Sequence, residues 1–146
     1  MNGSAGQGER GTASGGIALG PGEGRTIPGT DAMTLKASGE ETAGSIGFVE
    51  ATSPAGPGPP RHVHHGSDEL FYVLEGEFLF LVGERQVGAP PGMFVFVPRG
   101  TVHAAKVTGT EPGRVLAAYM PGAWSAPSRG SPSCGPSRAE AGPWRI

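Results

Sequence analysis

The sequence contains very little cysteine, no long apolar run and no strong excess of either charge. Its one cysteine, Cys134, can form neither an internal disulfide nor a cysteine-based zinc site, so a reducing, cytoplasmic setting is expected. The longest run of large apolar residues, 78–82, is far below the roughly 20 residues that cross a bilayer, which predicts a soluble protein. The formal net charge of -2 argues against a surface for polyanions, so nucleic acid is not expected as a partner.

Glycine and proline are abundant, with 27 and 15 residues among the 146 of the chain. This proportion is typical of sequences that are disordered in part. Residues 1–25 are rich in glycine, and residues 122–146 are rich in proline, serine, glycine and alanine. We therefore expect disordered segments at both ends and a single folded domain over residues 26–121.

Short apolar or alternating segments separated by turn signals predict an all-β domain. No segment has a sustained apolar period of 3.6 residues, which excludes a helical domain. The turn signals recur at intervals that suit a small antiparallel barrel or sandwich. The predicted strands are residues 33–37, 45–52, 61–65, 69–75, 77–82, 85–87, 93–97, 102–107 and 114–120.

Three histidines and one glutamate fall at spacings that favour a single metal site. In an extended strand His62 and His64 lie on one face, about 6.6 Å apart along the chain. Glu69 opens a second strand, which is expected to fold back beside the first as a hairpin. His103 arrives from a separate strand after the turn at residues 98–101. Burying four such groups in a small barrel is costly unless something satisfies all of them. One metal ion would do so, and hydrogen bonds among the four residues are the alternative.

Other polar residues near these segments have weaker functional interpretations. His65 is interpreted as a surface residue, and Asp68, a rival carboxylate to Glu69, as a solvated turn residue. Glu50 and Tyr72 are candidate cavity residues that could act as proton donors or support the ligating histidines. Alternation places Tyr72 on the face opposite Glu69, where packing between sheets is the competing interpretation.

The spacing of the motifs resembles the two signatures of the cupin superfamily. The first consists of Gly56, five residues, His62-Val63-His64, four residues, Glu69, six residues and Gly76. The second consists of Gly92, five residues, Pro98-Arg99-Gly100, two residues and His103, and 15 residues separate the two signatures. The amino-acid sequence of these segments is similar to that of bacterial cupins described as quercetin-dioxygenase-like. The resemblance covers roughly residues 27–121.

This resemblance implies a double-stranded β-helix, or jelly roll, that holds a metal inside the barrel and usually forms a homodimer. The metal ligands carried over are His62, His64, Glu69 and His103. Their nitrogen and oxygen donors suit a divalent transition metal, namely Fe, Mn, Ni, Cu, Co or Zn, and the sequence does not choose among these. Two departures are Val107, at a position often occupied by asparagine, and the low-complexity sequence after residue 121, where such cupins usually continue with an ordered segment.

The function implied by the resemblance is a dioxygenase that acts on a small enolisable or aromatic substrate. Glu69 or Glu50 would serve as the base that removes a substrate proton, with Tyr72 as a further candidate catalytic residue. Phe71, Val73, Phe80 and Phe94 would keep water from the reacting groups. A metal-dependent isomerase or decarboxylase would use the same site without oxygen, and a non-catalytic module that binds a small molecule or metal is the alternative from another class.

Overall fold

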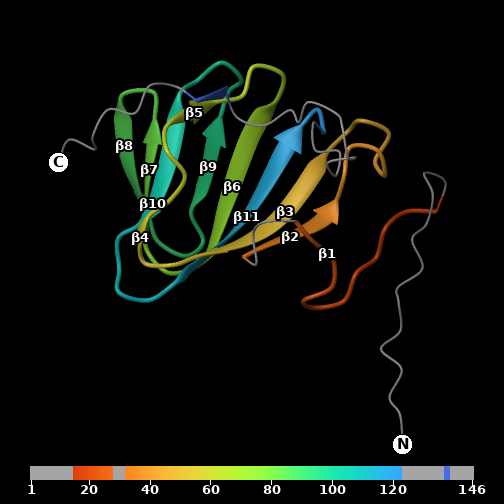
Figure 1. The fold of residues 1–146 in the computed structure, drawn as a ribbon, viewed down its shortest axis with the longest axis horizontal. Helices are drawn as coiled ribbons and strands as arrows, with labels where there is room; N and C mark the ends of the chain where they lie inside the picture. Colours follow the sequence, from red (N-terminus) through yellow and green to blue (C-terminus); the bar gives the residue numbers. More distant parts are fainter. Residues whose placement is uncertain (1–14, 28–31, 123–136, 139–146) are drawn as a thin grey trace, which may run out of the picture.

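The computed structural model describes residues 15–27, 32–122 and 137–138 of the chain (Figure 1). Within these ranges the structure consists of strands and connecting loops, with no helix. No helix of the described residues is long and apolar enough to cross a membrane. The strands are β1 (Arg25–Thr26), β2 (Met33–Ala37), β3 (Gly47–Ser53), β4 (Gly56–Pro57), β5 (His62–Val63), β6 (Asp68–Glu75), β7 (Phe78–Val82), β8 (Arg85–Ala89), β9 (Phe94–Val97), β10 (His103–Val107), β11 (Gly113–Met120) and β12 (Ser137–Arg138).

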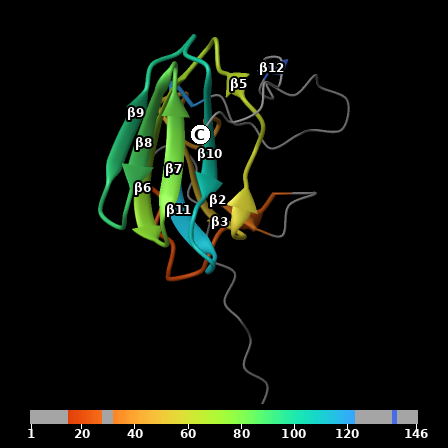
Figure 2. The ribbon, with the colours of Figure 1, turned by 90° about the vertical axis from the view of Figure 1, so that its left-hand side faces the viewer.

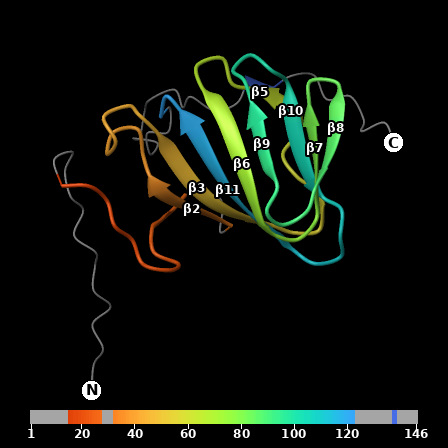
Figure 3. The ribbon, with the colours of Figure 1, turned by 180° about the vertical axis from the view of Figure 1, so that it is seen from behind.

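The strands form two antiparallel sheets that together make a jelly roll. The first sheet has the order β1-β2-β3-β11-β6-β9, which can be followed across the molecule in Figure 3. The second sheet has the order β12-β5-β10-β7-β8, with β4 also paired to β10. Figure 2 views the molecule from the side of β7, β8 and β10, with β11 and β3 of the first sheet beyond them. Strands distant in sequence are therefore neighbours in space.

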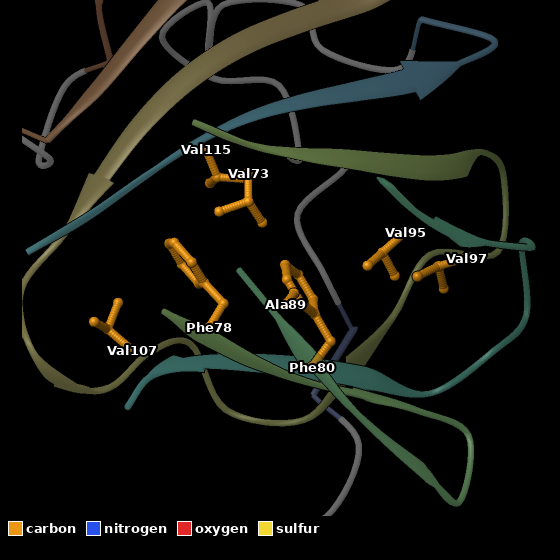
Figure 4. Packing of buried hydrophobic residues seen from close by; sticks show 8 residues of the cluster. All are labelled: Val73, Phe78, Phe80, Ala89, Val95, Val97, Val107 and Val115. Carbon is orange, nitrogen blue, oxygen red and sulfur yellow. The ribbon is translucent and has the colours of Figure 1, made fainter. Parts of the chain in front are cut away.

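The apolar core fills the space between the two sheets. Strand β6 shows the pattern that produces it, since Phe71 and Val73 face inward whereas Leu70 and Tyr72 face outward. The buried aromatic rings of Phe78 and Phe80 project from β7 toward the opposite sheet (Figure 4). The whole cluster comprises Val73, Phe78, Phe80, Ala89, Val95, Val97, Val107 and Val115. Val107, the departure from the asparagine of the second signature, thus contributes to the core.

Two glycines of the motifs adopt positive φ angles in the turns that connect these strands. Gly76, between β6 and β7, has φ of +78°, and an added Cβ would lie 2.7 Å from the Cα of Gly113. Gly100 also has φ of +78°, in a turn closed by the Thr101 amide donating to the Pro98 carbonyl at 3.1 Å. The turn predicted before His103 is therefore confirmed, and a side chain at either glycine would be strained.

The predicted strands correspond closely to β2, β3 and β5 to β11, but one predicted pairing is wrong. The expected hairpin between the strands carrying His62 and Glu69 does not form, because β5 pairs with β10 in one sheet and β6 pairs with β11 and β9 in the other. Residues 64–67 therefore cross from one sheet to the other. The two-residue strands β1, β4 and β12 were not predicted, because segments of this length carry no alternation.

The segments predicted to be disordered lie largely outside the described residues. Within the first of them, residues 15–24 are described, are mostly exposed and form no strand. Within the second, Ser137–Arg138 forms β12, paired with β5. The residues of the apolar run at 78–82 are buried or half-buried, and the exposed aromatic residues of the described part of the barrel lie on β6 and β9.

Candidate metal centre

The four predicted ligands converge at one end of the barrel interior. His62 lies on β5, His64 directly follows that strand, Glu69 lies on β6 and His103 on β10. Their potential ligand atoms all lie within 4.8 Å of one another. Ligands of a single ion lie at most about 4.2 Å apart, twice a metal–nitrogen distance of about 2.1 Å. Small side-chain adjustments would therefore place all four donors around one ion.

Strand pairing and turn contacts from both sheets bring these residues together. His103 pairs directly with His62 across β10 and β5. The Gly100 amide donates to the His64 carbonyl at 2.8 Å, which joins the turn before His103 to the loop that carries His64. Centroid separations of the imidazole rings are 5.0 Å for His62 and His64, 4.3 Å for His62 and His103, and 5.4 Å for His64 and His103.

Backbone carbonyls orient two of the three imidazoles. Nδ1 of His62 lies 2.9 Å from the Pro60 carbonyl oxygen, and Nδ1 of His103 lies 2.9 Å from that of Thr101. An Nδ1–H that donates to a carbonyl fixes the ring orientation and directs Nε2 to the opposite side, as is common for metal-ligating histidines. In His103, Nε2 faces the cluster.

One oxygen of Glu69 lies at the centre of the cluster. Nε2 of His103 donates to Oε2 of Glu69 at 2.7 Å, and both side chains are buried. Nε2 of His64 lies 3.2 Å from the same oxygen, but it is buried and has no hydrogen-bond partner. A buried nitrogen without a partner is costly, and an ion at this point would satisfy it. The donors therefore fit a metal.

The pKa values at the site follow from burial and from these contacts. Burial raises the pKa of Glu69, but the hydrogen bond from His103, with the nearby His64 and the Tyr119 hydroxyl, lowers it to about 2 overall. Burial lowers the pKa of His103, but the Glu69 carboxylate and the Thr101 carbonyl raise it above its usual value overall. Burial is the main cause of the lowered pKa of His62, which favours the neutral imidazole that a metal requires.

In the absence of an ion, the surroundings of His103 favour its protonated, positively charged form beside Glu69. Both of its ring nitrogens face acceptors, a carbonyl and a carboxylate, so both must be protonated for both hydrogen bonds to form. A metal ion would replace the proton on Nε2. Three neutral imidazoles and one carboxylate would leave a divalent ion with a net charge near +1.

The structure does not bring Glu50 and Tyr72 to the cluster. Glu50 follows the fully buried Val49 on β3 and faces outward, where it forms ion pairs with Lys36 at 3.4 Å and Arg114 at 2.9 Å. The hydrogen bond from Arg114 lowers the pKa of Glu50. Tyr72 faces outward from β6 and is 43% exposed, so it does not pack between the sheets. Alternation gave the residues that share a face, but not which face is inside.

The remaining candidates lie at or near the surface. His65 is exposed, in agreement with its interpretation as a surface residue. Asp68 is engaged in more than a solvated turn, because its carboxylate accepts from the backbone amide, Nε and Nη2 of Arg99 at 2.8, 3.1 and 3.0 Å. These hydrogen bonds lower the pKa of Asp68 to about 2. They fasten the start of β6 to the turn that precedes His103.

Tyr119 is a neighbour of the cluster that the sequence reasoning missed. It lies on β11 directly opposite Glu69, and its ring packs against His64 with centroids 5.3 Å apart. The flanking segment is apolar on both faces, so its sequence gave no sign of which face is inside. Finding Tyr119 required the register between β11 and β6.

The site has an apolar neighbourhood on its inner side. The ring of Phe71 lies 6.4 Å from that of His103 and 4.9 Å from that of Phe80, while Val97 lies opposite Glu69 across β6 and β9. Phe94, expected to exclude water, faces outward and is exposed instead. The inner apolar residues keep bulk water away from one side of the cluster.

Comparison with known proteins shows similarity to one family over the part of the chain that carries these residues. The model of the cupin domain matches residues 49–119. Quercetin 2,3-dioxygenase from Bacillus subtilis is 31% identical over 87 residues, 59% of this chain and 26% of that protein. The tetracenomycin polyketide synthase protein TcmJ from Streptomyces glaucescens is 29% identical over 92 residues, 63% of this chain and 60% of that protein. The chain therefore spans only part of these relatives.

Solved structures support the same assignment. The crystal structure of a predicted oxalate decarboxylase from Thermotoga maritima is 27% identical, with a TM-score of 0.58 over 60% of this chain and 77% of that one. KdgF from Halomonas sp. is 21% identical, with a TM-score of 0.53 over 61% of this chain and 76% of that one, which supports the fold alone.

Proposed function

Because this chain belongs to the cupin superfamily, as a cupin type 2 protein, we propose that its histidine and glutamate cluster binds one divalent transition metal and that the protein is a metal-dependent dioxygenase. The substrate would be a small enolisable or aromatic molecule. The observation that carries the metal site is the convergence of four donors, one of which, the buried Nε2 of His64, lacks a hydrogen-bond partner. The choice of dioxygenase is supported by similarity to the Bacillus subtilis enzyme.

His62, His64, Glu69 and His103 would hold the ion. Their donors suit Fe(II), Mn(II), Ni(II), Cu(II), Co(II) or Zn(II). When bound, the ion would supply Lewis acidity toward a substrate oxygen and, if redox-active, electron transfer to dioxygen.

The protein residues would orient the substrate, exclude water and accept a proton. Glu69 is the only carboxylate among the described residues of the cluster, so it is the candidate base in place of the outward-facing Glu50. A carboxylate with a pKa of about 2 is a weak base, so efficient proton removal would require a substrate proton that is already acidified. Phe71 and Phe80 would limit water on the inner side of the site.

An oxygen-uptake assay tests this function. Protein loaded with Fe(II), Mn(II), Ni(II), Cu(II) or Co(II) is incubated with flavonols, diketones and keto acids while dioxygen is recorded. Consumption of dioxygen with one of these substrates is expected, together with its loss in His64→Ala and His103→Ala and its retention in His65→Ala. Metal-loaded protein that leaves every substrate unchanged, with and without oxygen, would contradict catalysis and favour a binding module.

A decarboxylase is the second candidate. It is favoured by the similarity to the Thermotoga maritima structure, whose title describes a predicted oxalate decarboxylase. Such an enzyme would use the same ligands without net consumption of oxygen. Carbon dioxide release from oxalate or a keto acid at constant dioxygen would replace the dioxygenase proposal with this one.

We also propose that the protein is a homodimer. On the outer face of the first sheet, Tyr72, Phe94 and Phe96 are 43%, 55% and 45% exposed, and the last two lie on the edge strand β9. Exposed aromatic patches of this kind often mark interfaces, and a second copy would present the same patch across a two-fold axis. Phe94→Ser with Phe96→Ser should yield a monomer in light scattering. A monomeric wild-type protein would contradict the proposal.

A further inference from the structure

The buried tyrosine of β11 is the non-ligand side chain placed most directly against the candidate ligands. Tyr119 lies opposite Glu69 in the β11 and β6 register, on the inward face that also carries the buried Ala117 and Val115. Its ring is perpendicular to that of His64, with an interplanar angle of 81° and centroids 5.3 Å apart. Tyr119 thus contacts two of the four candidate ligands, which belong to different segments of the first signature.

A bound ion would change the hydrogen bonds that hold the Glu69 carboxylate. In the absence of an ion it accepts hydrogen bonds from Nε2 of His103 and from the Tyr119 hydroxyl. A bound ion would take the lone pair of Nε2, so the imidazole could no longer donate through that nitrogen. A tyrosine hydroxyl keeps its proton at neutral pH and remains a donor. Of these two hydrogen bonds, only the one from Tyr119 is compatible with coordination.

We propose that Tyr119 is a positioning residue that holds the Glu69 carboxylate in place once the imidazole nitrogens coordinate the ion. A hydrogen bond to one carboxylate oxygen favours coordination through a single oxygen, which would leave positions on the ion free for a substrate. The contact with His64 fixes the second ligand at the same time. This inference rests on the proposed metal site and extends it to a residue outside the ligand set.

The chain offers a matched control, because it contains two tyrosines, Tyr72 and Tyr119. Tyr119→Phe removes only the hydroxyl that contacts Glu69, and Tyr72→Phe removes a hydroxyl from the outer face of the same sheet. Each variant and the wild type are titrated with Co(II) against a chromophoric chelator, and the visible spectrum of the Co(II) complex is recorded. The circular dichroism and thermal unfolding of the metal-free proteins establish that each variant is folded.

We expect Tyr119→Phe to bind Co(II) at least about 10-fold more weakly, as is typical when a partner of a ligand is removed. We also expect its visible spectrum to change, because the coordination of Glu69 changes. Tyr72→Phe should match the wild type in both measurements. Tyr119→Phe with wild-type affinity and an unaltered spectrum would overturn the inference alone. A wild-type protein that binds no Co(II) would overturn the proposed metal site, and the inference with it.

If Tyr119→Phe does not fold, ¹⁹F resonances of labelled protein test the role of Tyr119 instead. Protein labelled with 3-fluorotyrosine gives a ¹⁹F resonance for each tyrosine, assigned with Tyr72→Phe. On titration with Zn(II), the Tyr119 resonance should shift until one equivalent is bound, while the Tyr72 resonance stays in place. A Tyr119 resonance that does not respond to saturating Zn(II) would overturn the inference.

Discussion

Strands β6 and β10 run through two regions of the barrel interior that are equally buried and chemically opposite. At one end they contribute Glu69 and His103, and four residues further along they contribute Val73 and Val107. The buried valines stabilise the fold by removing apolar surface from water. Burial of the glutamate and histidine is costly in itself, since each must be paired. The difference indicates that one end of the interior holds the fold together, whereas the other retains polar groups for binding.

The largest expected effect lies at the apolar end. Phe80→Ala removes a buried ring that packs between the sheets, so we expect the free energy of unfolding to fall by about 3–5 kcal/mol. Denaturant titration of the metal-free protein measures this loss. An effect below about 1 kcal/mol would mean that this end of the barrel does not behave as a packed core.

Ligand substitutions at the polar end should mainly weaken metal binding rather than folding. We expect His103→Ala and His64→Ala to weaken metal binding by at least about 100-fold, beyond the upper range typical for the loss of a ligand's hydrogen-bond partner. Competition titration with Zn(II) measures the affinity. The exposed His65→Ala is the matched control and should bind like the wild type. Equal affinity in all three variants would refute the ligand assignment.

The two regions should also differ in their response to acid. Protons compete with the ion for the imidazoles, so metal should be released as the pH falls below about 6.5, with the bound ion pushing the midpoint lower. The pKa of Glu69, lowered to about 2, keeps the carboxylate ionised throughout this range, so the release reports on the histidines. Metal content after dialysis at stepped pH measures the release. Full retention down to pH 3 would count against histidine ligation.

In the metal-free protein, the contribution of His103 to stability changes with pH in the direction opposite to that of metal binding. Because the pKa of His103 is raised in the folded state, its contribution to stability is complete below the ordinary histidine value and is lost as the pH rises through the raised value. The contribution of Glu69 is present above the ordinary carboxyl value and is lost as the pH falls through about 2. Metal affinity therefore increases with pH over the range in which the His103 contribution declines.

The smallest expected effect is at the ion pair that joins β6 to the turn before His103. Asp68→Asn weakens its hydrogen bonds with Arg99, so the two segments that carry the ligands would be less firmly held. We expect metal affinity to fall by about 10-fold or less. Glu84→Gln, which removes an exposed carboxylate from a turn, is the control. A loss as large as that of His103→Ala would mean that Asp68 itself is a ligand.

The sequence predicted most of the strands and all four members of the cluster, because both depend on local patterns. The short apolar run between Glu69 and Glu75 identified β6, and the turn at Gly100 set the start of β10. The prediction that was wrong concerned which strands pair with one another. The misplaced hairpin between His62 and Glu69 arose because consecutive strands are usually neighbours, whereas here the chain crosses between sheets.

The same limit explains the candidate residues that lie away from the site. Glu50 was expected to line the cavity, but it lies on the outer face of β3. Tyr119 was overlooked because its position opposite Glu69 is set by the register of β11 against β6. Local sequence patterns predict which side chains lie together, whereas the interior is defined only when both sheets are assembled.

X-ray absorption spectroscopy of the full-length protein loaded with one equivalent of Zn(II) shows directly whether the three histidines and Glu69 bind one ion. We expect a shell of nitrogen and oxygen ligands at about 2.0–2.2 Å, with the multiple-scattering features of three imidazoles. A spectrum without imidazole scattering, or one dominated by sulfur at about 2.3 Å from the single cysteine, would contradict this expectation.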